Sequence, residues 1–139
     1  MKILVDTNII LDFLLEREPF LEDAAALFQA IESGLAIGYA TATTLTNIFY
    51  IARRHTQSIE RARQAVRTIL AVMRICPVNR AVLRHALEFE IPDFEDAVQI
   101  ACAFDRRLDA IVTRDLRFAA SPIRVLTVRQ LLEQLVPTE

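Results

Sequence analysis

Residues 3–10 read ILVDTNII, a run of three apolar residues that stops at the carboxylate of Asp6. A short, continuously apolar run of this kind is typical of a strand buried on both faces of a parallel sheet. Ligands of open α/β sheets bind just beyond the carboxyl ends of the strands, which is where Asp6 would lie. Asp6 and Asn8 are also well suited to cap a helix that starts at Ile9. From this stretch alone, capping and chemistry are both open roles for Asp6.

Two later acidic segments, PDFED at residues 92–96 and TRD at residues 113–115, favour chemistry. Asp93 and Asp96 are three residues apart, so at the start of a helix they share a face near its positive end. Asp115 ends another apolar run, as Asp6 does. Clustered carboxylates repel one another and raise one another's pKa values, and a divalent cation removes that penalty. The three segments therefore predict a cation site.

The hydrophobic periodicity predicts alternating strands and helices. Strands are expected near residues 2–5, 36–40, 74–78, 110–113 and 123–126, and helices near 9–15, 20–33, 43–55, 58–72, 79–90, 94–107 and 128–135. Strands separated by helices indicate a parallel sheet with right-handed crossovers and helices on both faces.

Composition is that of one small domain over residues 1–139. Apolar residues make up 53% of the chain, which is enough for a sizeable core, and we find no linker, repeat or low-complexity tract. The apolar start is interrupted by Asp6, Asn8 and Asp12, which argues against a signal peptide or a membrane span. Cys76 and Cys102 are too few and too far apart to indicate a zinc site or a disulfide scaffold. We expect a cytoplasmic protein with no membrane partner.

Four segments in register resemble the PIN domain family, which includes the VapC-type toxin ribonucleases. They are ILVDTNIILDFLLEREPF (residues 3–20), YATATTLTNIFY (39–50), PDFEDAVQIACA (92–103) and IVTRDLRF (111–118). No single segment is specific, but their order and spacing fit nearly the whole chain. The resemblance implies a three-layer α/β/α sandwich with a central parallel sheet of four to five strands, related to the flap-nuclease fold.

The resemblance also implies a function and a set of site residues. Asp6, Asp96 and Asp115 match the family's catalytic, metal-binding acids, and Asn8 and Thr113 match the polar residues that accompany them. The expected protein is an endoribonuclease that uses Mg²⁺ or Mn²⁺ to hydrolyse phosphodiester bonds of single-stranded or loop RNA. Its expected partners are the RNA substrate and, for a toxin of a toxin–antitoxin pair, a small antitoxin. A second copy of the chain, as a homodimer, is a further candidate.

Asn47 departs from the family pattern, because many members carry Glu at that position. Asn can offer its carbonyl oxygen to a metal or hold a metal-bound water, but it brings no charge. Asp93 and Glu95 are the candidates to restore the missing charge. Asp93 shares a helix face with Asp96, whereas Glu95 is expected to point well away from it, although capping is the expected main role of Asp93.

The net charge of −2 is unusual for a protein that binds RNA, but 15 of the 16 basic residues are arginine. Arginine can grip phosphate with two donors and stack on unpaired bases. The candidate RNA-binding residues are Arg114 and Arg117, which flank Asp115, and Tyr50 and Arg54, which follow Asn47 by about one and two helical turns. A core-edge position for Tyr50 and a solvated surface charge for Arg54 are at least as common.

Two other functions compete with metal-assisted phosphodiester hydrolysis. The first is a catalytically weak PIN-like module that binds RNA or protein, because Asn47 leaves the metal too weakly held. The second is an aspartyl-phosphate phosphatase, which needs a second acid two residues after its nucleophile. Asn8 stands there instead, so the phosphatase is disfavoured.

Overall fold

The computed structural model describes residues 1–115, 118 and 121–135. One parallel sheet of five strands has the order β3-β2-β1-β4-β5. The strands are β1 (Lys2–Val5), β2 (Ile37–Thr41), β3 (Arg74–Cys76), β4 (Ala110–Val112) and β5 (Val125–Leu126). The helices of the described residues are α1 (Thr7–Leu14), α2 (Leu21–Glu32), α3 (Ala42–Thr56), α4 (Ile59–Val72), α5 (Arg80–Ala86), α6 (Phe94–Asp105) and α7 (Val128–Leu135).

The predicted elements are all present, and their ends differ by a few residues. The largest difference is at α5, because the predicted helix extends to residue 90 whereas α5 ends at Ala86. Tight turns follow, with the N–H of Glu88 donating to the carbonyl of His85 and that of Phe89 to Ala86. Pro92 disfavours helical geometry in the residue before it, so the chain must leave the helix before α6 begins.

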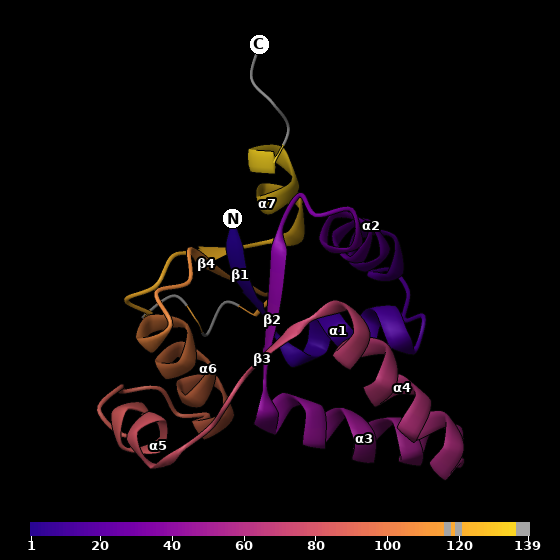
Figure 1. The fold of residues 1–139 in the computed structure, drawn as a ribbon, viewed down its shortest axis with the longest axis horizontal. Coiled ribbons are helices and arrows are strands. Elements are labelled where there is room, and N and C mark those ends of the chain that lie inside the picture. The colour runs from indigo at the N-terminus through magenta and orange to yellow at the C-terminus, as the bar shows by residue number, and fades with distance from the viewer. Residues whose placement is uncertain (116–117, 119–120, 136–139) are drawn as a thin grey trace.

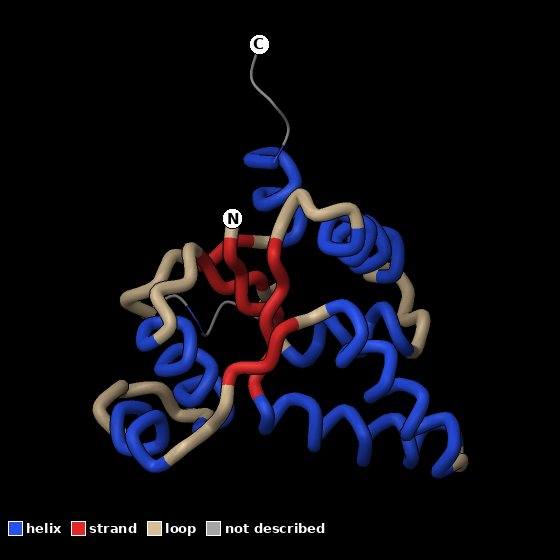
Figure 2. The backbone as a smooth tube through the Cα atoms, in the orientation of Figure 1, coloured by secondary structure: helices blue, strands red, loops and turns tan. Residues whose placement is uncertain are grey.

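Alternation along β1 explains the three layers. Ile3 and Val5 point into a core with α1, α2, α3, α4 and α7, whereas Leu4 points to the opposite face and packs with α5 and α6. Figure 1 shows α5 and α6 on one side of the sheet and α1 to α4 on the other, and Figure 2 shows the strands running between them. The predicted α/β/α sandwich with a parallel central sheet is confirmed.

The strand order places β1 at the switch point of the sheet, where the chain stops adding strands on one side and starts adding them on the other. From β1 the chain builds β2 and β3 on one side, and it then returns to add β4 and β5 on the other. In the β1–β4 pair, Val5 lies opposite Val112, so the residues that follow, Asp6 and Thr113, are neighbours at the carboxyl edge. This reversal is where open α/β sheets form a ligand crevice.

No helix within the described residues is long and apolar enough to cross a membrane.

Candidate active site

Asp6 lies at the carboxyl end of β1 and occupies the N-cap position of α1, yet its side chain makes no capping hydrogen bond. Asp6 is 4% exposed, and its carboxylate receives two other hydrogen bonds. Gln99 Nε2 donates to Oδ1 at 3.0 Å, and Thr113 Oγ1 donates to Oδ2 at 2.9 Å. Asp6 is therefore held between α6 and the end of β4, and its side chain is not used as a cap.

A pocket of about 140 Å³ opens beside Asp6. Its lining residues come from the end of β1, from α1, from α3, from the start of α6 and from the loop after β4: Asp6, Thr7, Asn8, Leu11, Asn47, Ile51, Asp93, Glu95, Asp96 and Asp115. The acidic members of this set are drawn from three separate parts of the sequence. The structure thus brings Asp6, Asp96 and Asp115 together with Asn8 and Asn47, as the sequence predicts, while their chemical roles stay predictions.

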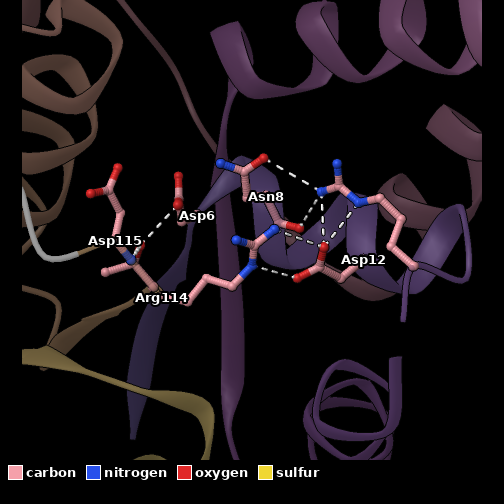
Figure 3. Close-up of polar contacts among 7 residues, drawn as sticks. Asp6, Asn8, Asp12, Arg114 and Asp115 are labelled. Carbon is pink, nitrogen blue, oxygen red and sulfur yellow. Dashed lines mark hydrogen bonds and ion pairs between the residues drawn. The ribbon is translucent and has the colours of Figure 1, made fainter. Parts of the chain in front are cut away.

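Asp115 and Asn8 are oriented by neighbours outside the pocket. The N–H of Asp115 donates to Thr113 Oγ1 at 3.0 Å, so one threonine hydroxyl contacts both Asp6 and Asp115. Asn8 accepts from Arg17 Nη2 through its backbone carbonyl, at 3.0 Å. Figure 3 shows Asp6 and Asp115 on one side of Asn8 and Asp12 on the other.

Asp93 and Glu95, the two candidates to replace the charge that Asn47 lacks, have different contacts. Asp93 is the N-cap of α6, and its Oδ1 accepts from the N–H of Asp96 at 3.1 Å, which confirms the predicted capping. Glu95 follows Asp93 by two residues and is expected on a different helix face from Asp96, yet it lines the same pocket as Asp96. Helical spacing separates side chains around an axis, but the pocket lies at the end of that axis, where first-turn side chains on different faces can converge.

A chain of buried hydroxyl groups fixes Glu95. Thr7 Oγ1 donates to Glu95 Oε1 at 2.7 Å, which uses the only hydroxyl proton of Thr7. Thr44 Oγ1, 2.9 Å from Thr7 Oγ1, must therefore be the donor in that contact, and Thr44 in turn accepts from Thr41 Oγ1 at 3.1 Å. The chain Thr41–Thr44–Thr7–Glu95 links the end of β2 to the start of α6.

The predicted RNA-binding residues are more scattered. Tyr50 is 54% exposed on α3 and Arg54 is exposed two turns beyond Asn47, and neither lines the acidic pocket. Arg114 turns its guanidinium to the buried carboxylate of Asp12, with Nε 3.0 Å from Oδ2. Arg117 lies outside the described residues.

Sequence reasoning missed Gln99 and Asp12. Both are lone polar residues inside otherwise apolar helical runs, and that pattern is a usable signal, since a buried polar group normally has a specific partner. Gln99 is almost fully buried and bonds Asp6, while its Oε1 has no hydrogen-bond partner among the described residues. Such a buried acceptor is ordinarily satisfied by an ordered water.

The sequence matches the PIN domain family over residues 2–117. The chain belongs to the PIN domain family. The resemblance inferred from the four segments is therefore confirmed, and because PIN domains are typically nucleases, membership supports a nuclease.

Solved structures share the PIN fold. VapC20 of Mycobacterium tuberculosis, described as a toxin that cleaves the sarcin–ricin loop, is 18% identical with a TM-score of 0.72, covering 87% of this chain and 95% of its own. A toxin–antitoxin complex from Klebsiella pneumoniae is 26% identical with a TM-score of 0.66, covering 90% and 96%. VapBC2 of Rickettsia felis, bound to a DNA fragment from its promoter, is 13% identical with a TM-score of 0.69, covering 91% and 98%. The curated protein sequences gave no match.

PIN domains generally use divalent metals, and the donors of this pocket fit a hard cation. The pocket offers carboxylate and amide oxygens, which suit Mg²⁺ and Mn²⁺. Within the described residues, no three His, Cys, Asp or Glu side chains are gathered closely enough to hold a metal ion by themselves. That spacing is compatible with Mg²⁺, which keeps several of its waters and needs only one or two carboxylates.

The charge of Asp6 is costly in this PIN domain without a cation. Burial raises the pKa of its carboxyl above the ordinary value; the hydrogen bonds from Gln99 and Thr113 act in the opposite direction, and the nearby Glu95 carboxylate raises it further. An acid whose pKa is raised by folding makes the folded state less stable at pH values above that pKa.

We therefore expect Asp6→Asn to stabilise the metal-free protein. Removing the buried charge should raise the free energy of unfolding at neutral pH by about 1 kcal/mol, which is about 3 °C in Tm for a chain of this size. The gap between variant and parent should shrink on acidification, because the parent's Asp6 then takes up a proton. Differential scanning calorimetry in EDTA at neutral and mildly acidic pH measures both effects. A lower Tm for the variant at neutral pH would show that the hydrogen bonds outweigh the burial.

Proposed function

We propose that this PIN domain protein is an endoribonuclease that depends on Mg²⁺ or Mn²⁺ and hydrolyses phosphodiester bonds in single-stranded or loop RNA, as the toxin of a toxin–antitoxin pair. One observation carries the proposal. Asp6, Asp96 and Asp115, which match the family's acidic positions, come from three separate segments and line one pocket at the switch point of the sheet. An acid that only caps a helix or forms an ion pair does not have to lie near other acids. Acids that are gathered in one pocket repel one another, and a bound cation removes that repulsion.

The residues of the pocket would divide the work of hydrolysis. A bound divalent cation lowers the pKa of a water and stabilises the charge that develops on the phosphate oxygens. Asp6, Asp96 and Asp115 would hold the cation, with Gln99 and Thr113 keeping Asp6 in one orientation. As the water oxygen bonds to phosphorus and the P–O bond to the leaving nucleotide breaks, one of these carboxylates would take up the water's proton.

Glu95 is the group that we propose supplies the charge that Asn47 lacks. Both residues line the same pocket, on walls formed by α6 and α3. Asp93 uses Oδ1 to cap α6, whereas Glu95 is presented to the pocket by the hydroxyl of Thr7. Sequence spacing favours Asp93 as the residue that supplies this charge, whereas the contacts in the structure favour Glu95.

The substrate and partner rest on coarser support. VapC20, whose name records cleavage of the sarcin–ricin loop, supports an RNA loop as the substrate class. The Klebsiella pneumoniae and Rickettsia felis structures are toxin–antitoxin complexes, which supports an antitoxin as the partner. Exposed Tyr50 and Arg54, on the same helix as Asn47, would extend the RNA path by stacking and by a phosphate contact. Such a pair would act in the cytoplasm.

A second candidate is a PIN-like module that binds RNA or protein without cutting. Two observations favour it: Asn47 replaces the usual acid, and no three acidic side chains among the described residues form a ready cation site. Metal titration followed by an RNA cleavage assay separates the two functions, since the module would bind RNA and leave it intact.

Asp96→Asn and Asp115→Asn should each abolish metal-dependent RNA cleavage, because each removes a charge that would hold the cation. The loss should be at least about a hundredfold, the size found for groups that stabilise charge in a transition state. Asp93→Asn is the matched control and should cost much less, because Asn also caps helices well. Single-turnover cleavage of a labelled RNA at saturating Mg²⁺ measures all three, and circular dichroism checks the fold. Equal loss at Asp93 would make it a metal ligand.

Swapping charge between α3 and α6 tests Glu95 without a cleavage assay. Glu95→Gln should weaken Mn²⁺ binding by about tenfold, or about 1.4 kcal/mol, while Asn47→Glu should tighten it by a similar factor. The double variant Glu95→Gln with Asn47→Glu should return close to the parent. Isothermal titration calorimetry of the metal-free proteins with MnCl₂ gives the three constants.

Each outcome of that titration has a distinct meaning. A parent protein that binds no Mn²⁺ would contradict the proposed nuclease. A parent that binds Mn²⁺ as tightly as Glu95→Gln would leave the nuclease standing and exclude Glu95. If Asn47→Glu had no effect, Asn47 would not act on the metal.

A further inference from the structure

Asp12 is a fully buried carboxylate that lies outside the acidic pocket, with an exposure of 0%. Two arginines bind it from different segments. Arg17 places Nε and Nη2 2.9 Å from Oδ1, and Arg114 places Nε 3.0 Å from Oδ2 and Nη2 3.2 Å from Oδ1 (Figure 3). One close cation is enough to balance the charge of a buried carboxylate. Asp12 has two, so the cluster Asp12–Arg17–Arg114 carries a net charge of +1.

The surplus charge faces outward. The side chains of Arg17 and Arg114 are 33% and 36% exposed, although the carboxylate that anchors them has no exposure. In the described part of the chain, Nη1 of neither arginine has a hydrogen-bond partner. Arg114 also stacks on Phe20, with its Cζ 3.9 Å from the ring centroid. Each guanidinium is thus fixed by the protein on one edge and keeps donors on the other.

The cluster adjoins the acidic pocket. Arg17 Nη2 donates to the carbonyl of Asn8, and Asn8 lines the pocket, while Arg114 immediately precedes Asp115. Asn8 and Asp12 are four residues apart on α1, so they share a face about 6 Å apart along the helix axis. The anchor of the cluster therefore lies about one helical turn from the lining of the pocket.

We propose that Asp12 presents Arg17 and Arg114 as a binding subsite for a phosphate of the RNA backbone next to the bond that is cut. The inference rests on the proposed function, which places the scissile phosphate at the acidic pocket. A guanidinium group can donate two hydrogen bonds to one phosphate in a fixed geometry. A strand laid along α1 would meet two positive centres in succession, the cation of the pocket and the Asp12–Arg17–Arg114 cluster, and both match the repeating charge of a polynucleotide. The subsite reads the backbone and not the bases.

Salt-dependent RNA binding tests the subsite. The probe is a fluorescein-labelled single-stranded RNA of about ten nucleotides in mixed sequence, titrated in Ca²⁺ with fluorescence anisotropy over a series of KCl concentrations, with the RNA checked for integrity on a gel. Arg17→Gln and Arg114→Gln should each lower the affinity by about tenfold and reduce the slope of log K against log [salt] by about 0.7, the value for one phosphate contact on a single strand. Arg67→Gln, which removes an exposed arginine of α4 paired with Glu60, is the control and should change neither.

The results separate the subsite from the function on which it rests. If the parent binds RNA and both glutamine variants keep its affinity and slope, the cluster is a structural tie or serves an acidic protein segment, and the subsite is refuted. If the parent binds no RNA, the nuclease proposal falls with it. Should Arg17→Gln fail to fold, Arg17→Lys keeps the charge and loses the fork, so it should retain the slope and lose affinity. Unchanged affinity for Arg17→Lys would count against the subsite.

Discussion

The buried carboxylate of Asp6 is the constraint around which the candidate site is built. It is fixed by donors from two elements, Gln99 on α6 and Thr113 after β4, at 3.0 and 2.9 Å. Its position follows from the topology, because β1 lies between β2 and β4, at the point where the order in which strands are added to the sheet reverses. The fold therefore gathers acids around a buried carboxylate, and burial together with the Glu95 carboxylate raises the pKa of Asp6. A bound divalent cation would relieve both penalties.

The charges near the switch point are separated into two regions, which reconciles a net charge of −2 with the proposed RNA substrate. The acidic pocket collects carboxylates from three segments, and the Asp12–Arg17–Arg114 cluster beside it is positive. The two regions meet at Asn8, which lines the pocket and accepts a hydrogen bond from Arg17 through its backbone carbonyl. An arginine inside the pocket would neutralise the acids and compete with a cation. Anchoring both arginines on Asp12 instead directs their remaining donors to solvent.

The sequence predicts what depends on local pattern and chain order. Apolar runs that end in acids predict β1 and β4, and the rule that parallel strands share one carboxyl edge is enough to place Asp6 and Asp115 near each other. Gln99 and Arg114 depend instead on tertiary register, since their partners Asp6 and Asp12 lie 93 and 102 residues away. Helical periodicity ranks Asp93 above Glu95 because it describes faces along an axis, whereas this pocket lies at the end of the α6 axis and is lined by both residues.

The position of Asn47 shows why the family pattern and the physics of the site can differ. A cation responds to the summed field of nearby charges, and that sum depends on distance and not on the element that carries each charge. Asn47 and Glu95 face the same pocket of about 140 Å³, so an acid on α6 can act on the same space as one on α3. The buried hydroxyl chain from Thr41 to Thr7 fixes the carboxylate of Glu95 in this position, because Thr7 Oγ1 donates to Glu95 Oε1 at 2.7 Å. A PIN domain that carries Asn47 therefore stays compatible with metal binding.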